Sequence, residues 1–281
     1  MHLSPRCAAL PIVLAAAVAG CKPAAPRPAG AAEAGASETA IPPRAPLVVT
    51  IEASDYALSL PARVPAGPVT FRLVNRGKEL HHAQVIRLES GKTAGDYMRA
   101  YTDQGAMPGW VRYLGGPAGT PAAQEHLSAT VLTPGHYAVM CRVASPDGVI
   151  HLKKGMIREF DVVAEGGSPE GSLPAATDTV RLNDYGFVSH RPLTTGHHAI
   201  LVENDGPQPH ELVMLKLAPG KSPVDFATWG LAGRHGPPPG MPIGGVEFLD
   251  QGARGVFPVD LGPGDYGFIC FVPDSKDGKR H

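Results

Sequence analysis

Short runs of alternating apolar and polar residues, separated by turn-forming residues, occupy most of the chain. VTFRLVN (69–75) and HAILVEN (198–204) are rich in β-forming residues, and each ends at an Asn-x-Gly turn. In HYAVMC (136–141) and DYGFIC (265–270), alternate residues fall on one face of a strand, and each run ends in a cysteine. The pattern predicts an all-β chain of short strands.

The same pattern occurs twice at a constant offset of 129 residues, without a gap from Thr50/Thr179 to Cys141/Cys270. The matching landmarks include Asp55-Tyr56 with Asp184-Tyr185, Gly115-Gly116 with Gly244-Gly245, and Gly135 and Tyr137 with Gly264 and Tyr266. A shared register over this length predicts two duplicated domains, 47–163 and 178–281. The polar, Gly/Pro-rich stretch 164–177 is interpreted as their linker.

One insertion in each repeat has a helix-start signal. Thr93-x-x-Asp96 and Ser222-Pro223-x-Asp225 both place a capping residue three positions before an acidic residue. We therefore expect a short helix in each domain, and a cap or turn role for the recurring aspartates Asp55 and Asp184.

Composition and charge narrow the functional classes. Gly (34 residues) and Pro (30 residues) suit short strands joined by turns rather than long helices. The formal net charge of −1 argues against nucleic acid as a partner. No phosphate-binding loop, Gly-x-Ser-x-Gly elbow or zinc-protease helix motif is present in the sequence.

The N-terminus predicts export. Residues 1–20 have a basic residue followed by an apolar run, as in a signal peptide, and Val18-Ala19-Gly20-Cys21 resembles the bacterial lipobox. That resemblance implies lipid attachment to Cys21, with the Pro/Ala-rich stretch 21–46 as a tether. The protein is thus expected to be extracytoplasmic and lipid-anchored to a bacterial membrane; a soluble secreted protein is the alternative.

Only Cys141 and Cys270 remain in the predicted mature domains. Each closes an alternating strand of its own repeat and should face its own core. A disulfide between them would require the two cores to meet, which we consider unfavourable. Two separate buried thiols, or two metal ligands, are the remaining interpretations.

Histidine, cysteine and methionine recur in an order typical of a soft-metal site. In the first repeat His81 follows a turn, Cys141 closes a strand, His151 follows a loop, and Met156 opens the next strand. Imidazole, thiolate and thioether are the ligand types of a blue-copper site. The second repeat offers His210, Cys270 and His281 as a weaker counterpart. Taken singly, each residue also has an ordinary turn, core or loop role.

The residues Asn75, Gly77 and His81, then Gly135, Tyr137 and Cys141, then His151, Gly155 and Met156 carry a resemblance to a known family. In this order they resemble the cupredoxins, the plastocyanin and azurin family. The resemblance implies two tandem Greek-key β-sandwiches, a copper cofactor and electron transfer with a redox protein partner.

Two features depart from the cupredoxin pattern. Nine residues, RVASPDGVI (142–150), separate Cys141 from His151, where cupredoxins usually have two to four. Pro-Asp-Gly turns could fold such a loop back. The sequence also stops at His281, so the second domain lacks a final strand of its own. Either another segment takes the place of that strand or the sequence is truncated at its C-terminus, and we favour truncation.

Three functions are therefore weighed. The first is a copper-binding cupredoxin-like protein that carries electrons or holds copper and is not an enzyme. The second is a metal-free module that uses its loops for binding. A multicopper enzyme is disfavoured, because such enzymes relay electrons through a His-Cys-His step and Cys141 here stands between Met140 and Arg142.

Overall fold

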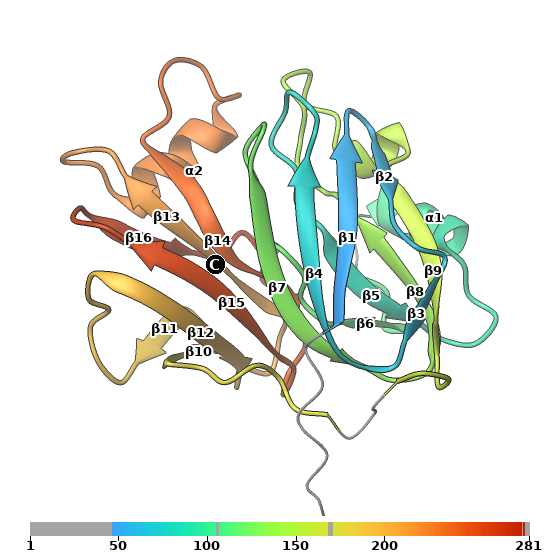
Figure 1. Ribbon diagram of the computed structural model, residues 1–281. Helices are drawn as coiled ribbons and strands as arrows, with labels where there is room; N and C mark the ends of the chain where they lie inside the picture. The colour runs from blue at the N-terminus through green and yellow to red at the C-terminus, as the bar shows by residue number, and fades with distance from the viewer. Residues whose placement is uncertain (1–46, 105–106, 168–170, 277, 279–281) are drawn as a thin grey trace, which may run out of the picture. The chain divides into compact units, whose positions relative to one another are not determined.

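The computed structural model consists mostly of β-strands, with two short α-helices (Figure 1). It describes residues 47–104, 107–167, 171–276 and 278. The predicted signal peptide, tether and Cys21, and also His281, lie outside the described residues. Among the described residues, no helix has the length and apolar character needed to cross a bilayer.

The largest sheet has eight strands and contains residues of both repeats. Its order is β11-β10-β12-β15-β7-β4-β1-β2. The strands are β1 (Leu47–Ser54), β2 (Ala57–Ser59), β4 (Gly67–Asn75), β7 (Glu125–Leu132), β10 (Asp178–Asn183), β11 (Gly186–Ser189), β12 (Gly196–Asn204) and β15 (Arg254–Leu261).

Two smaller sheets belong to one repeat each. The first has the order β3-β9-β8-β5-β6 and the second the order β14-β13-β16. Their strands are β3 (Arg63–Pro65), β5 (Gln84–Leu88), β6 (Val111–Tyr113), β8 (Gly135–Met140), β9 (Ile157–Val163), β13 (His210–Leu217), β14 (Gly240–Leu249) and β16 (Tyr266–Ile269). Within the described residues, β16 has no counterpart of β9 beside it.

Strand pairing confirms the register read from the sequence. Thr50 pairs with Arg72 in the parallel pair β1–β4, and Thr179 pairs with Leu201 in the parallel pair β10–β12. Thr179 and Leu201 each lie 129 residues after their counterparts Thr50 and Arg72. The antiparallel pairs β4–β7 and β12–β15 correspond in the same way. The repeated sequence therefore forms a repeated arrangement of strands.

The two predicted helices are present and begin where the cap signals predicted. Helix α1 spans Ala94–Gln104 and helix α2 spans Pro223–Leu231. Ser222 accepts a hydrogen bond from the Asp225 amide while the Asp225 side chain accepts one from the Ser222 amide, which is a complete capping box. Proline at the first helical position adds to this start signal.

The core of the first repeat lies between the large sheet and the five-stranded sheet. Ile51 and Phe71 from the large sheet pack with Tyr137 and Val139 of β8 and Phe160 of β9. The other face of β8 is also buried, because its alternate residues Ala138 and Met140 pack in a second cluster that includes Tyr97 of α1. A strand buried on both faces is a rigid support for the cysteine that follows it.

The two repeats are joined by backbone contacts. Val256 of β15 pairs with Ala129 of β7, which makes the eight-stranded sheet continuous. Isolated bridges join Leu114 to Leu249 and Pro117 to Val246. The side-chain amide of Gln84 also donates a hydrogen bond of 3.1 Å to the Phe248 carbonyl across the same boundary.

Candidate metal centre

Three separate parts of the first repeat bring His81, Cys141 and His151 together. His81 follows β4 and is held by a backbone bridge to Thr120. Cys141 is the residue directly after β8, and His151 opens a short 3₁₀ helix, His151–Lys154. All three side chains are completely buried.

The long loop after Cys141 returns His151 to the cysteine. The Ser145 amide donates to the Val149 carbonyl at 2.9 Å, and a bridge joins Ala144 to Ile150. The His151 amide then donates to the Val143 carbonyl at 2.8 Å. The nine-residue excursion is therefore a small hairpin-like turn, as the Pro-Asp-Gly sequence in it predicted.

The potential ligand atoms of these residues converge. His81 Nδ1 lies 3.1 Å from His151 Nδ1, and the Cys141 Sγ lies 3.3 Å from His151 Nδ1 and 3.9 Å from His81 Nδ1. All three atoms lie within 4.8 Å of one another, and no other such group of three occurs in the described residues. One metal ion could bind all three.

A carboxylate holds the far nitrogen of each imidazole. His81 Nε2 is 2.7 Å from Asp55 Oδ1, and His151 Nε2 is 2.9 Å from Glu79 Oε2. A carboxylate can only accept, so each Nε2 carries the hydrogen and each Nδ1 is left with its lone pair. Carboxylate–histidine pairs of this kind orient imidazoles in metal sites.

The pKa values agree with ionised carboxylates at this position. Burial alone would raise the pKa of Asp55, but hydrogen bonds from the Lys78 amide and from His81 lower it. The pKa of Glu79 is likewise lowered, because the Tyr56 hydroxyl and His151 outweigh its burial. Burial lowers the pKa of His151 and favours its neutral form.

The donor set fits a soft or borderline metal. Two imidazole lone pairs and one sulfur face one another, and the single thiol proton cannot satisfy all of them. Burial raises the pKa of Cys141 to about 12, so a bound metal would have to displace the thiol proton. Nitrogen and thiolate ligands in this combination suit copper in both of its common oxidation states.

Met156 follows the 3₁₀ helix that begins at His151 and precedes strand β9. It is fully buried, its carbonyl accepts from the Cys141 amide at 3.0 Å, and its amide donates to the His151 carbonyl at 3.0 Å. The backbone of Met156 is thus hydrogen-bonded to the backbones of both Cys141 and His151. Its role as a weak thioether ligand stays a prediction.

The second repeat keeps part of this arrangement. His210 Nε2 lies 3.0 Å from Asp184 Oδ1, as His81 does from Asp55, and Cys270 follows β16 and is buried. Gln208 replaces Glu79 and donates to Asp274 Oδ2 at 3.2 Å. Because His281 lies outside the described residues, the role of the second set stays a prediction. Both Cys141 and Cys270 are free thiols, as expected.

Sequence reasoning missed the partners of the histidines. Asp55 recurs as Asp184, but a turn role seemed sufficient, whereas the structure places Asp55 on His81. The Tyr56 hydroxyl donates to Glu79 Oε1 at 2.6 Å, and its ring centroid lies 5.0 Å from that of His151. The repetition of the Asp-Tyr pair was the available signal.

Comparison with known proteins gives similarity of structure only. No family model and no curated protein matches the sequence. The chain is similar to reduced auracyanin from Roseiflexus castenholzii, at 14% identity over 42% of this chain and 98% of that chain, with a TM-score of 0.31. It is similar to auracyanin A, a blue copper protein from Chloroflexus aurantiacus, at 16% identity over 42% of this chain and 100% of that chain, with a TM-score of 0.29. A multicopper oxidase matches 79% of this chain with 82% of its own, at 15% identity and a TM-score of 0.26.

Proposed function

We propose that the protein binds copper in its first repeat and carries single electrons or holds the metal, on two tandem cupredoxin-like Greek-key sandwiches. The observation that carries this proposal is the convergence of His81 Nδ1, Cys141 Sγ and His151 Nδ1 in a fully buried position. An imidazole–thiolate set has the ligand types of a blue-copper site.

The chain's own residues would keep the site geometry constant. Asp55 and Glu79 hold the two imidazoles in the tautomer that directs Nδ1 toward the sulfur. The His82 amide donates to Cys141 Sγ at 3.4 Å, which would stabilise a thiolate. When bound, copper would supply the one-electron change between Cu(I) and Cu(II). Complete burial of all three ligand side chains excludes water from them.

We extend the proposal to location and partner from the sequence. An exported protein attached to a bacterial membrane through Cys21 would act outside the cytoplasm and exchange electrons with a redox protein. It would do so without catalysing a reaction of its own. Labelling with radioactive palmitate, compared between the full chain and Cys21→Ala, tests the anchor: loss of label in the variant is expected.

Copper loading of the full chain tests the central proposal. We expect an intense thiolate-to-copper absorption band that Cys141→Ala abolishes and that Cys270→Ala retains, because Cys270 is a buried thiol of the second repeat. The two variants remove the same atoms from matched positions. A protein that shows no such band, or a band equally strong in Cys141→Ala, contradicts the proposal.

A further inference from the structure

The second repeat has an open sheet edge where the first repeat has a strand. In the first repeat β9 runs antiparallel to β8, with Phe160 opposite Tyr137 and Val162 opposite Gly135. β16 is the counterpart of β8, and among the described residues its one neighbour in the sheet is β13. The backbone amide and carbonyl groups on the outer side of an edge strand can pair with a further strand. β16 can therefore accept one.

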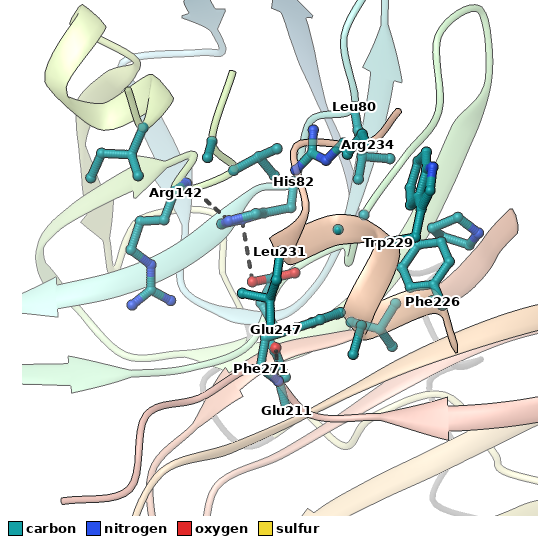
Figure 2. Close-up of a pocket in the computed structure, with 18 of the residues that line it drawn as sticks. Leu80, His82, Arg142, Glu211, Phe226, Trp229, Leu231, Arg234, Glu247 and Phe271 are labelled. Carbon is teal, nitrogen blue, oxygen red and sulfur yellow. Dashed lines mark hydrogen bonds and ion pairs between the residues drawn. The ribbon is translucent and has the colours of Figure 1, made fainter. Parts of the chain in front are cut away.

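The other edge of the same sheet is in contact with the first repeat. Val246 of β14 forms a backbone bridge with Pro117. His82 of the first repeat also reaches β14, because its Nδ1 lies 3.2 Å from Glu247 Oε2 in the cavity that Figure 2 shows. Within the described structure, β16 is thus the edge of this sheet that stays open.

A groove of about 440 Å³ lies beside β16. It is lined by Tyr266 and Phe268 of that strand and by residues 192–194, among others. Residues 192–194 correspond, at the offset of 129, to β3, which pairs with β9 on the side away from β8. The groove therefore lies between the counterparts of the two strands that flank β9 in the first repeat.

The groove leaves open the apolar side chains that β9 would cover. Phe160 of β9 stacks on Tyr137 with ring centroids 5.5 Å apart, and Tyr137 is completely buried. Its counterpart Tyr266 is half-buried, and Phe268 is half-buried where Val139 of the first repeat is completely buried. A further strand with apolar side chains on one face would bury both rings, and this burial would favour its binding.

The described chain does not fill the groove itself. The Ser275 amide donates to Gln208 Oε1 at 2.8 Å, so the chain after β16 stays beside the turn that precedes β13. That turn lies at the Cys270 end of β16, whereas the groove is lined by residues 262–265 at the opposite end. None of the described residues takes the place that β9 has in the first repeat.

Charge distinguishes the expected occupant from β9. In the first repeat His136 of β8 lies 2.9 Å from Asp161 and 3.8 Å from Glu159, both on β9. Asp265 stands at the position of His136, is exposed, and forms no ion pair with any residue that the structure describes. Opposite charges on neighbouring strands stabilise a sheet and like charges destabilise it. A basic residue would therefore suit the position beside Asp265.

Two basic residues near the groove leave Asp265 unbalanced. Arg191 lines the groove, but its Nε lies 3.0 Å from Asp178 Oδ1. Lys216 is opposite Tyr266 in the pairing of β13 with β16. Successive residues of a strand face opposite sides of the sheet, so Lys216 and Asp265 face different sides.

We propose that the groove beside β16 binds an extended segment of a partner protein as an added strand, with apolar side chains against Tyr266 and Phe268 and a basic side chain beside Asp265. Such strand addition combines main-chain hydrogen bonds, which give affinity, with pockets for alternate side chains, which give specificity. β9 is the model for the direction and the apolar pattern of the segment. This inference goes beyond copper binding and does not depend on it.

Two peptides based on β9 test the proposal on the metal-free full chain. The first is the fluorescein-labelled peptide of residues 157–163, IREFDVV, and the second is the same peptide with Asp161→Lys. In fluorescence anisotropy we expect one site per chain and about three- to tenfold tighter binding of the second peptide, because it replaces a like-charge pair with an opposite-charge pair. Asp265→Lys in the protein should reverse this preference.

Two tryptophan variants locate the bound peptide. Thr194→Trp places a large side chain in the groove and should abolish binding. Thr228→Trp makes the same substitution at an exposed position of α2 and should bind as the wild type does. Urea unfolding midpoints show that both variants fold. Hydrogen exchange in residues 266–269 should slow when the peptide is bound, because β16 then lies inside a sheet.

Four results would overturn the proposal. They are the absence of peptide binding, an unchanged preference in Asp265→Lys, equal binding by the two tryptophan variants, and a dimer in sedimentation that the peptide does not dissociate. The last result would assign the open edge to a second copy of this chain. Because all these measurements use metal-free protein, a failure of copper loading would leave their outcome unchanged.

Discussion

Replacement of Glu79 tests whether the carboxylates beside the imidazoles govern metal binding. Glu79 accepts from His151 Nε2 at 2.9 Å, and Glu79→Gln keeps the shape and one acceptor oxygen while it removes the charge. The second repeat has glutamine, Gln208, at the matching position, so the side chain is compatible with this fold.

The expected loss follows from the change in hydrogen-bond type. A hydrogen bond to a charged group contributes about 1.5–3 kcal/mol and a neutral one about 0.5–1.5 kcal/mol, so the difference is about 1–1.5 kcal/mol. Each 1.4 kcal/mol changes an affinity about tenfold, so Glu79→Gln should weaken copper binding about tenfold. Glu79→Ala leaves His151 Nε2 without this partner and should weaken copper binding further. Loss of a residue that hydrogen-bonds to a metal ligand typically weakens metal binding by up to about a hundredfold.

Competition between the metal-free protein and a chromophoric Cu(I) chelator measures this affinity without oxidising the thiol. Glu125→Gln is the matched control, because Glu125 pairs with Arg72 on the surface of the large sheet. Urea unfolding of each metal-free variant separates an effect on metal binding from an effect on folding. Equal copper affinities for Glu79→Gln, Glu79→Ala and Glu125→Gln would refute the role assigned to Glu79.

Three further predictions concern stability. Burial raises the pKa of Cys141 and of Cys270 to about 12 from an ordinary value of 9.0, so above pH 9 the unfolded chain loses these protons first. The free energy of unfolding should therefore fall with rising pH by about 1.4 kcal/mol per pH unit for each thiol. In reduced, metal-free Cys270→Ala, urea unfolding between pH 9 and 11 should show a fall that is smaller by the share of one thiol. An equal fall in the variant and the wild type would contradict this. Ser222→Ala removes the capping box of α2 and should lower the free energy of unfolding, measured in urea, by about 1 kcal/mol. Thr228→Ala removes a hydroxyl from within the same helix and should lower it by less. Gly116→Ala should lower the melting temperature more than Gly148→Ala does. Both glycines have positive φ (113° and 78°), so alanine would be strained by about 1–3 kcal/mol at either position. Only at Gly116 would the added carbon also overlap the Ala83 carbonyl oxygen. Equal melting temperatures for the two glycine variants would show that this close approach is unimportant.

The local elements and the grouping of three site residues were predictable from the sequence. Alternation located β4 and β12, the cap signals located both helices, and the repeat offset fixed the strand register. The turn after β4, the end of β8 and the Pro-Asp-Gly loop together predicted that His81, Cys141 and His151 would approach one another. Each of these signals depends on a short stretch of chain.

The features that the sequence did not predict depend on contacts between distant segments. Glu79 reaches His151 only because the loop after Cys141 returns to the turn that carries Glu79. His82 has a glutamate, Glu211, at the matching position of the second repeat, so the repeat gives no sign that His82 faces Glu247 across the boundary between the repeats. The junction of β7 with β15 likewise follows from the meeting of two strand edges, which no local pattern encodes.

That junction has a consequence for how the protein can be divided experimentally. Cleaving the chain within 164–177 and separating the two fragments would expose the edges of β7 and β15 that meet at Ala129 and Val256, because each strand lies at an inner edge of its half of the sheet. Exposed strand edges promote self-association, so each separated fragment should associate with itself more readily than the intact chain does. Reassembly of the two separately produced fragments into one soluble particle would be the natural measure of how strongly the shared edge holds them.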